Sequence, residues 1–567
     1  MRIFYLSIIF FFFLLSHVSF AQVVTFTDPA FKGNLLNNYT INTNGDNEIQ
    51  VSEANAYSGI IDCSDLNISS LDGIEEFTNL TVLWCQKNFL SSLDLTSNVK
   101  LTELICFENE IATLLLPANS KLKKIDCSIN EITSLNTINT PYLATLNANF
   151  NQISSINLSA CTNLSILNIS SNNLTALDVS SNVNLINVFC SNNEIGTLDF
   201  LLNPLLVYVG VQSNQLTSLN VDNSADLEFL SCSDNLLSSI DIENNTVLEN
   251  LNCSKNNLTT LNVSQNVELT SLQCDNNNLS YLDVTLNTLL KTLYFDHNSI
   301  SIINLLTLTE LEKLDASFNN LTALNIQNNP FINSLYCSNN QISELDLTAH
   351  STLFKVNCEH NLLSNLDLSG NAALKELKMG NNQISSLDVG HITFLAKLHC
   401  DTNSISTIDA SNNLYLKEFF VNSNQLIELN IMNGQNTSIH KTHGPGQNDP
   451  FNSKNNPDLE CIDVDNASWS NAHWKLIDTT SFFYPVCSTF AINETVNPID
   501  VYPNPTSGKL TVLGFDDNPT FEIIDVLGHV LFTTKSPDID VRFLKNGIYI
   551  LKITTNNKIQ SFQFIKE

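Results

Sequence analysis

Oxygen-bearing side chains recur at alternate positions of the segment NTNGDNEIQVSE, residues 42–53. Hard cations such as Ca²⁺ are bound by carboxylate and amide oxygens that project from one short loop at this kind of spacing. The side chains at the ligand positions of such a loop are Asn42, Asn44, Asp46, Glu48 and Glu53. The segment therefore predicts a calcium site, in which the ion would stiffen its surroundings rather than take part in catalysis.

This loop resembles the calcium loop of EF-hand proteins, with two departures. Asn42 replaces the first Asp, and Asn47 replaces the Gly at the sharp turn. Asn can adopt the left-handed conformation needed there, but loss of the first carboxylate weakens the affinity for the ion. The alternative is a metal-free Asn/Gly turn before a short helix in SEANAYSG. No cofactor other than Ca²⁺ is predicted.

Cysteine is the second residue type with metal or redox chemistry, and the chain has 14. From Cys85 to Cys400, ten of them are separated by 21 residues or a multiple of 21. On stacked strands such thiols lie about 4.8 Å apart and parallel, whereas a relaxed disulfide needs Cβ atoms about 3.8 Å apart. We therefore predict free thiols that act as small buried apolar groups. With Cys63, they are Cys85, Cys106, Cys127, Cys190, Cys232, Cys253, Cys274, Cys337, Cys358 and Cys400.

Cys461 and Cys487 follow no such spacing. They lie in a segment that also contains Trp469 and Trp474. A stack of repeats must cover its last apolar surface, and large aromatic side chains suit that role. We predict a disulfide between the two cysteines in a C-terminal cap, residues 437–487, with the tryptophans over the last repeat.

Catalytic motifs are missing from the sequence. It has no G-x-S-x-G, H-E-x-x-H or phosphate-binding loop. His440 and His443 stand in the loop-like stretch HKTHGPGQNDP, where a zinc pair is the alternative to an ordinary loop. We expect a protein that is not an enzyme.

The positions of these residues are set by a repeat. From Leu80 to Asn436 the chain repeats a 21-residue pattern seventeen times without insertion or deletion, as L-x-x-L-x-C-x-x-N-x-L-x-x-L-D-L-x-x-N-x-x. Positions 4 and 6 have the period of a strand with one buried face, so positions 3, 5 and 7 point outward. Such a period predicts one supersecondary unit stacked on copies of itself.

Position 9 is Asn in every copy. One inward amide per repeat can satisfy backbone groups of the neighbouring repeat, which would otherwise cost about 1–3 kcal/mol each. Asp or Asn at position 15 favours local side-chain-to-backbone turns, and no helical period is present on that side. The predicted Asn ladder includes Asn88, Asn172, Asn256, Asn340 and Asn424.

The pattern resembles bacterial leucine-rich repeats of the internalin type, in particular the cysteine-ladder variety with 21-residue repeats. The resemblance covers residues 58–436, with a longer first repeat at 58–79 in which Leu66 replaces the Asn. It implies a solenoid with a parallel β-sheet on the concave face and an extended or 3₁₀ convex side. It also implies a non-enzymatic binding protein at a bacterial surface. Residues 22–57 would then form the N-terminal cap.

The N-terminal segment MRIFYLSIIFFFFLLSHVSFA, residues 1–21, has the pattern of a secretory signal peptide. An uncleaved membrane anchor is the alternative. No later stretch is long and apolar enough to span a bilayer, so we expect no transmembrane segment after removal of the signal.

The C-terminal segment has a different register. After a linker at 488–497, residues 498–567 show short alternating apolar runs broken by turn residues, which predicts a small antiparallel β-sandwich. The motifs VYPNPTSGKLTV, IIDVLGHVL, NGIYILKI and FIKE resemble the type A sorting domain of the type IX secretion system of Bacteroidetes. This resemblance implies passage through the outer membrane by that machinery and a secreted or cell-surface location. An additional adhesive module is the alternative.

The net charge is −32, and Arg2 and Arg542 are the only arginines. Such a surface repels phosphate backbones and anionic lipids, which argues against nucleic-acid and membrane-surface binding. Cationic proteins, Ca²⁺ and neutral glycans remain compatible partners.

The outward strand face is the expected binding site. Phe189, Tyr208 and Phe229 come from three consecutive repeats and are predicted to form one aromatic strip. Such residues suit protein or sugar recognition, although cross-strand stacking would explain them equally well. We expect protein binding or adhesion first, glycan or biofilm polysaccharide binding second, and a hydrolase third. The outward aromatics are Trp84, Phe107, Phe150, Phe189, Tyr208, Phe229, Tyr294, Tyr336 and Phe420.

Overall fold

The computed structural model describes residues 22–38, 40–118, 120–439, 449–487, 499–513, 519–555 and 559–567. The predicted signal peptide, the linker 488–497 and the pair His440 and His443 lie outside these ranges. The chain divides into two compact units, Met1–Pro485 and Val486–Glu567.

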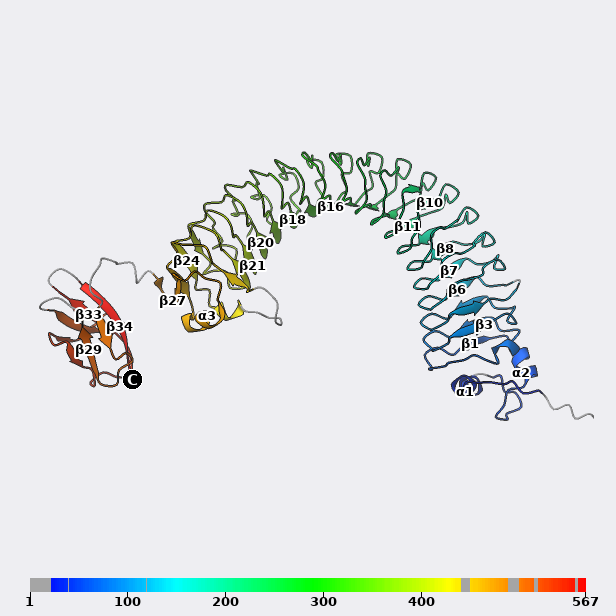
Figure 1. Cartoon of the computed structure of the whole chain (residues 1–567), viewed down its shortest axis with the longest axis horizontal. Coiled ribbons are helices and arrows are strands. Elements are labelled where there is room, and N and C mark those ends of the chain that lie inside the picture. The colour runs from blue at the N-terminus through cyan, green and yellow to red at the C-terminus, as the bar shows by residue number, and fades with distance from the viewer. Residues whose placement is uncertain are drawn as a thin grey trace, which may run out of the picture. The chain divides into compact units, whose positions relative to one another are not determined.

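The first unit is the predicted solenoid. Its short strands form one 19-stranded parallel sheet that lines the inner side of the stack of repeats (Figure 1). The strands are β1 (Ile60–Asp62), β2 (Val82–Trp84), β4 (Glu103–Ile105), β6 (Lys124–Asp126), β7 (Thr145–Asn147), β8 (Ile166–Asn168), β9 (Asn187–Phe189), β11 (Tyr208–Gly210), β13 (Phe229–Ser231), β14 (Asn250–Asn252), β15 (Ser271–Gln273), β16 (Thr292–Tyr294), β17 (Lys313–Asp315), β18 (Ser334–Tyr336), β19 (Lys355–Asn357), β20 (Glu376–Lys378), β21 (Lys397–His399), β23 (Glu418–Phe420) and β25 (Phe451–Asn452).

Register between neighbouring strands follows the repeat residue by residue. Leu272 pairs with Leu293, and Leu293 pairs with Leu314, so position 4 forms an unbroken buried column. Positions 3 and 5 flank it and are mostly exposed or half-buried. The predicted alternation is therefore confirmed, and equivalent residues of successive repeats lie side by side on the concave face.

Position 8, in the turn that follows each strand, holds a left-handed residue. Its φ lies between 51° and 59° in all seventeen repeats, and the residues include Ile129, Phe150 and His297. This conformation costs a non-glycine residue about 1 kcal/mol. The amide it exposes donates to the next repeat, for example from His297 N to Ser317 O at 3.0 Å, which holds the turn in place.

The Asn ladder at position 9 has the predicted role. Asn256 Nδ2 donates to Cys232 O at 3.0 Å in the preceding repeat and to Cys253 O at 3.2 Å in its own. Its Oδ1 accepts from Leu237 N at 2.9 Å. Each amide thus ties its own turn to the preceding repeat, and the ladder continues beyond the predicted repeats to Asn456, which donates to Val421 O at 3.1 Å.

A second buried amide column runs along position 19, on the convex side. Asn287 is fully buried, and its Nδ2 donates to Val263 O at 2.9 Å and to Asn266 O at 2.8 Å. Its Oδ1 has no hydrogen-bond partner within the described part of the chain. Cys161 and His350 take the same position in their repeats and are also fully buried.

The convex side is extended, as predicted. Position 15 accepts the backbone amide two residues on, as in Asp178 Oδ1 with Ser180 N at 2.9 Å. Short parallel strands occur in some repeats. They are β3 (Ser92–Asp94), β5 (Thr113–Leu115), β10 (Thr197–Asp199), β12 (Ser218–Asn220), β22 (Thr407–Asp409) and β24 (Glu428–Ile431).

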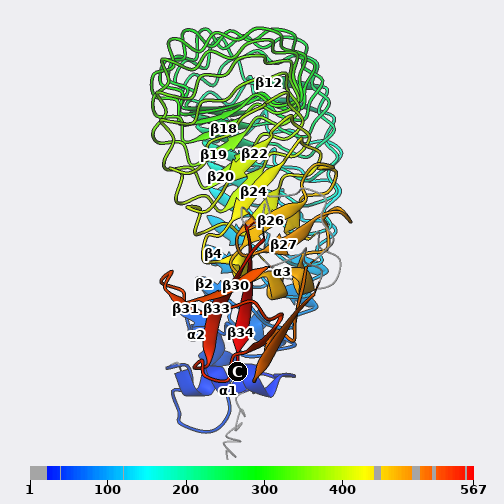
Figure 2. The same ribbon diagram turned by 90° about the vertical axis from the view of Figure 1, so that its left-hand side faces the viewer.

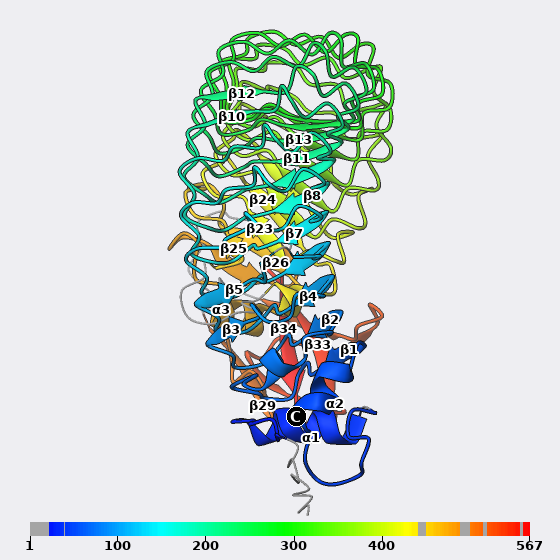
Figure 3. The same ribbon diagram turned by 90° about the vertical axis from the view of Figure 1, so that its right-hand side faces the viewer.

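Both ends of the solenoid are covered. Helices α1 (Pro29–Asn38) and α2 (Val51–Ala56), with the 3₁₀ turn η1 (Ile74–Glu76), lie at the end near β1 (Figures 1 and 3). The other end carries η2 (Asn436–Ser438), β26 (Cys461–Val464), α3 (Ala467–His473) and β27 (Phe482–Tyr484), with α3 beside β27 (Figures 1 and 2).

Trp474 forms the core of the C-terminal cap. It is buried, stacks on Phe451 with ring centroids 4.4 Å apart, and donates from Nε1 to Ile439 O at 2.8 Å. Trp469 is half-buried and meets Trp474 edge-on at 5.8 Å.

The cysteines divide into two groups. Cys461 and Cys487 are disulfide-bonded. The remaining twelve are buried free thiols, and burial raises the pKa of those in the position 6 column, for example of Cys232 to about 12.

The second unit is a small antiparallel β-sandwich, as the sequence predicted. One sheet has the order β28–β29–β32 and the other β31–β30–β33–β34, with Leu510, Phe521, Leu551 and Phe564 in the core. The strands are β28 (Asp500–Tyr502), β29 (Lys509–Leu513), β30 (Thr520–Ile524), β31 (Val530–Thr534), β32 (Asp538–Asp540), β33 (Gly547–Thr554) and β34 (Ile559–Lys566).

Candidate ligand-binding face

The concave sheet brings most of the predicted aromatic residues to one face. Trp84, Phe189, Tyr294, Tyr336 and Phe420 occupy position 5, Tyr208 and Phe229 occupy position 3, and Phe107 occupies position 7. Tyr208 is exposed and the others are half-buried. Phe150 does not belong to this set: it is the left-handed position 8 residue of its repeat and lies in the turn that follows the strand.

The predicted three-residue aromatic strip is only partly formed. Tyr208 and Phe229 are register partners, and their ring centroids lie 6.3 Å apart. Phe189 belongs to the neighbouring column, because its register partner is Gly210. A Cβ on Gly210 would come within 2.9 Å of Phe189 Cδ1, so the ring of Phe189 lies over the glycine. The strip is therefore a pair of rings with Phe189 beside it.

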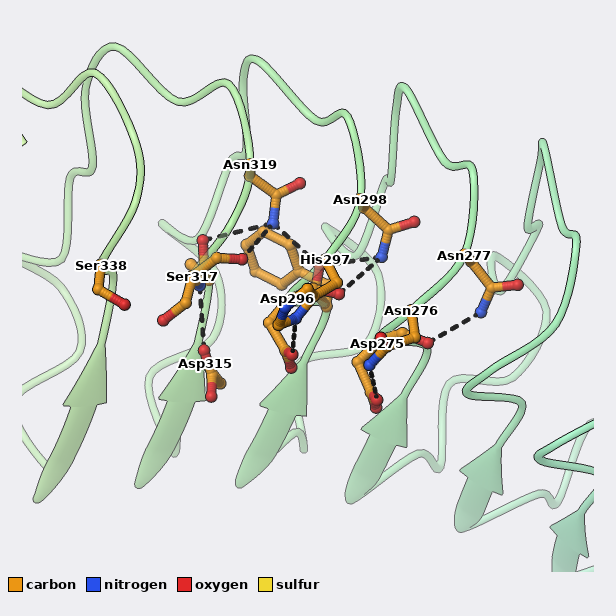
Figure 4. A network of polar contacts seen from close by, with 12 residues as sticks. Asp275, Asn276, Asn277, Asp296, His297, Asn298, Asp315, Ser317, Asn319 and Ser338 are labelled. Carbon is orange, nitrogen blue, oxygen red and sulfur yellow. Dashed lines mark hydrogen bonds and ion pairs between the residues drawn. The ribbon is translucent and has the colours of Figure 1, made fainter. Parts of the chain in front are cut away.

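Three carboxylates gather on the same face at β15 to β17, which the sequence analysis did not predict (Figure 4). Asp275 and Asp296 are the position 7 residues of successive repeats, and Asp315 is the position 5 residue of the next. We call these three residues the acidic patch. No lysine or arginine of the described residues forms an ion pair with them. Among the described residues, the polar contact of Asp296 Oδ2 is with the imidazole of its neighbour, His297 Nδ1, at 2.8 Å.

Burial and mutual repulsion act together in the acidic patch. The pKa of Asp315 is raised to about 6, mainly by desolvation and further by the charges of Asp296 and Asp275. Desolvation and the charge of Asp296 also raise the pKa of Asp275, although the charge of Lys255 partly offsets this rise. Carboxylates that are half-buried, close together and not paired with a lysine or arginine oppose folding when they are ionised.

Two tyrosines and two serines border the acidic patch. Asp315 is the register partner of Tyr294 on one side and Tyr336 on the other. Its Oδ1 accepts from Ser317 N at 3.0 Å. Ser338 is only 5% exposed, and its hydroxyl has no hydrogen-bond partner among the described residues, although Figure 4 shows it directed toward Ser317.

A second charged cluster lies at β21 and β23, and it is neutralised internally. His399 Nε2 lies 3.0 Å from Glu418 Oε1, and Lys397 pairs with the other oxygen of Glu418 at 3.2 Å. The imidazole of His399 also stacks on Phe420 with ring centroids 4.4 Å apart. Phe420 is thus held by its neighbour, which favours a stiffening role for this aromatic residue.

The predicted calcium loop is held by hydrogen bonds among its own residues. Glu53 Oε1 accepts from Thr43 N and Thr43 Oγ1, each at 2.7 Å, and Glu53 Oε2 accepts from Gln50 N at 3.0 Å. Asp46 Oδ2 accepts from Asn44 Nδ2 at 2.9 Å and from Gln50 Nε2 at 3.0 Å.

The other predicted ligands also have partners within the protein. Asn42 Oδ1 accepts from Gly45 N at 2.9 Å, and Glu48 pairs with Lys32 at 2.6 Å. No three His, Cys, Asp or Glu side chains of the described residues converge on a possible metal position. These contacts are those of the metal-free turn that is the alternative to a calcium site, and calcium binding by this loop stays a prediction.

Comparison with known proteins separates the two units. Residues 500–567 match the secretion system C-terminal sorting domain family. The protein is therefore secreted or displayed at the outer-membrane surface. No helix among the described residues is long and apolar enough to cross a membrane.

The repeat unit matches solved leucine-rich-repeat structures. A TDR receptor aligns over 73% of this chain and 81% of that chain at 20% identity, with a TM-score of 0.61. YopM from Yersinia enterocolitica aligns over 72% and 91% at 24% identity, with a TM-score of 0.56. The functional domain of InlJ from Listeria monocytogenes, which includes a cysteine ladder, aligns over 92% and 93% at 22% identity, with a TM-score of 0.49. No curated protein matches the chain. The similarities to the TDR receptor and to YopM show the fold.

Proposed function

We propose that this protein binds a protein partner at the bacterial surface through the concave face of its solenoid. The observation that carries the proposal is the composition of that face. The buried columns keep the same apolar or Asn character in nearly every repeat because stacking requires it. Positions 3, 5 and 7 instead vary among charged, polar and aromatic residues, and the aromatics there are exposed or half-buried. Aromatic side chains on a rigid, curved sheet are typical of protein recognition sites.

The comparisons agree with this proposal at a coarser level. Among the solved structures, a TDR receptor is by its name a receptor, and the sorting domain brings the solenoid to where it meets external partners. The secretion machinery that recognises the sorting domain is then a second, transient partner.

A glycan-binding function is the second candidate, and the pair Tyr208 and Phe229 favours it. Tyr208 is 41% exposed, and its hydroxyl donates to Glu228 Oε2 at 3.3 Å. Neighbouring rings with adjacent hydrogen-bonding groups can stack on the apolar face of a sugar ring.

Affinity capture from surface extracts tests both candidates. The full mature chain would be compared with the double variant Y208A/F229A, and with F394A/Y415A as a matched control, because Phe394 and Tyr415 also stack, at 5.8 Å, but at position 21. Loss of a captured protein in the first variant alone supports the proposal. Retention of a neutral polysaccharide at high salt, with no captured protein, favours the glycan function. Equal capture by all three chains contradicts both.

A further inference from the structure

We propose that the acidic patch is the binding site for an arginine side chain of the partner. This inference rests on the proposed function and specifies the chemistry of its ligand. Asp275, Asp296 and Asp315 supply the carboxylates, and Tyr294 and Tyr336 flank Asp315 in the same column. The site covers four successive repeats, β15 to β18.

Charge complementarity identifies the occupant as a cation. The protein carries 57 acidic and 25 basic residues, yet lysines are paired with acids elsewhere on the concave face, as in Lys124 with Glu103 at 3.2 Å. The acidic patch lacks such a partner within the described chain. A partner that brings a positive charge would relieve the repulsion among the three carboxylates.

The tyrosines favour arginine over lysine. A guanidinium is planar, stacks on aromatic rings and donates two parallel hydrogen bonds to a carboxylate, whereas an ammonium group is a strongly hydrated point charge. Asp315 between Tyr294 and Tyr336 offers both features at adjacent strand positions. The metal alternative is weaker, since no three His, Cys, Asp or Glu side chains of the described residues converge as a metal site would require.

Ser338 provides an independent indication of a ligand. The residue is only 5% exposed, and its hydroxyl has no hydrogen-bond partner in the described structure. Buried polar groups are normally paired. Because the hydroxyl is directed toward Ser317, whose amide donates to Asp315 (Figure 4), a donor or acceptor placed in the acidic patch would complete its bonding.

The test is binding of a fluorescein-labelled arginine peptide to the full mature chain, measured by anisotropy at physiological salt. Two further peptides have citrulline, the neutral isostere of arginine, or lysine in its place. The informative variant is D315N, in which the Oδ1 acceptor for Ser317 N is kept. The matched control is D126N, because Asp126 is also a position 5 carboxylate whose Oδ1 accepts from a serine amide, Ser128 N, at 3.2 Å.

We expect D315N to weaken arginine-peptide binding at least tenfold, D126N to change it less than twofold, and the citrulline peptide not to bind. The lysine peptide should bind several-fold more weakly than the arginine peptide. Equal effects of the two variants would show general charge attraction and overturn the proposal, as would undiminished binding of the citrulline peptide. The proposed function fails separately if the intact protein captures no partner whose capture is reduced by Y208A/F229A or by D315N.

Discussion

Replacing Asp315 with Asn should increase the stability of the solenoid at neutral pH. The pKa of Asp315 rises from 3.8 to about 6 on folding, a change of about two units. At about 1.4 kcal/mol per unit, the ionised carboxylate lowers the free energy of unfolding by about 3 kcal/mol at pH 7.5. Asn removes the charge and keeps the acceptor for Ser317 N. We therefore expect D315N to gain about 1–3 kcal/mol, since the loss of one charge also relieves Asp275 and Asp296.

The pH dependence has a defined sign. Because the folded-state pKa is the higher one, the penalty is fully present above about pH 6, shrinks as the pH falls toward 4, and vanishes once both states are protonated. Urea unfolding followed by far-ultraviolet circular dichroism would compare wild type, D315N and the control D126N at pH 7.5 and pH 4.

The control separates this effect from general charge removal. Asp126 Oδ2 faces an amide, Asn147 Nδ2, at 3.1 Å, instead of other carboxylates. D126N should therefore bring no comparable gain. If D315N is less stable than wild type at pH 7.5, or if its advantage is the same at pH 4, the repulsion argument is refuted.

Three further outcomes are expected. The side chain of His350 makes one hydrogen bond, from Nε2 to Ile326 O at 3.0 Å, and its Nδ1 has no partner among the described residues, whereas Asn329 at the same position donates two. H350N should therefore gain about 0.5–1.5 kcal/mol in the free energy of unfolding by urea, and the reverse change N329H should lose stability. A loss in H350N would contradict the role of the convex column. Thiol titration of the denatured, unreduced protein should find twelve free groups, and fourteen would exclude the disulfide. Since Asp46 and Glu53 already accept several hydrogen bonds, millimolar Ca²⁺ should leave the melting temperature unchanged, whereas a rise that EDTA reverses would place the cation at this loop.

The sequence was sufficient for the fold because the repeat makes each buried column visible. Position 4 pairs with position 4 of the next strand, as Leu293 does with Leu314, and the position 9 amide is invariant. The left-handed position 8 was not predictable from composition, since residues as different as Ile129, Phe150 and His297 occupy it. For that reason Phe150 was wrongly expected on the strand face.

The candidate site was predicted less well because it depends on relations between columns. The three aromatics of consecutive repeats were expected to align, but Phe189 differs from Tyr208 by two positions and lies over Gly210. The acidic patch leaves a signal that was overlooked: Asp275 and Asp296 are adjacent in one column, and Asp315 follows in the next repeat. Reading the outward columns across repeats, rather than along the chain, would have found it.

The acidic patch is informative because nothing in the fold requires it. Asn serves the same turn at position 5 in another repeat, where Asn252 Oδ1 accepts from Ser254 N at 3.1 Å, close to the 3.0 Å of Asp315 with Ser317. A carboxylate at position 315 therefore adds charge without adding a backbone contact, and the charge opposes folding at neutral pH. Residues that lower stability without a structural benefit tend to belong to binding sites. The stability and binding measurements are therefore connected, because the substitution that stabilises the free protein should also weaken the complex. If D315N stabilises the fold yet binds the arginine peptide normally, the acidic patch is not a binding site for arginine.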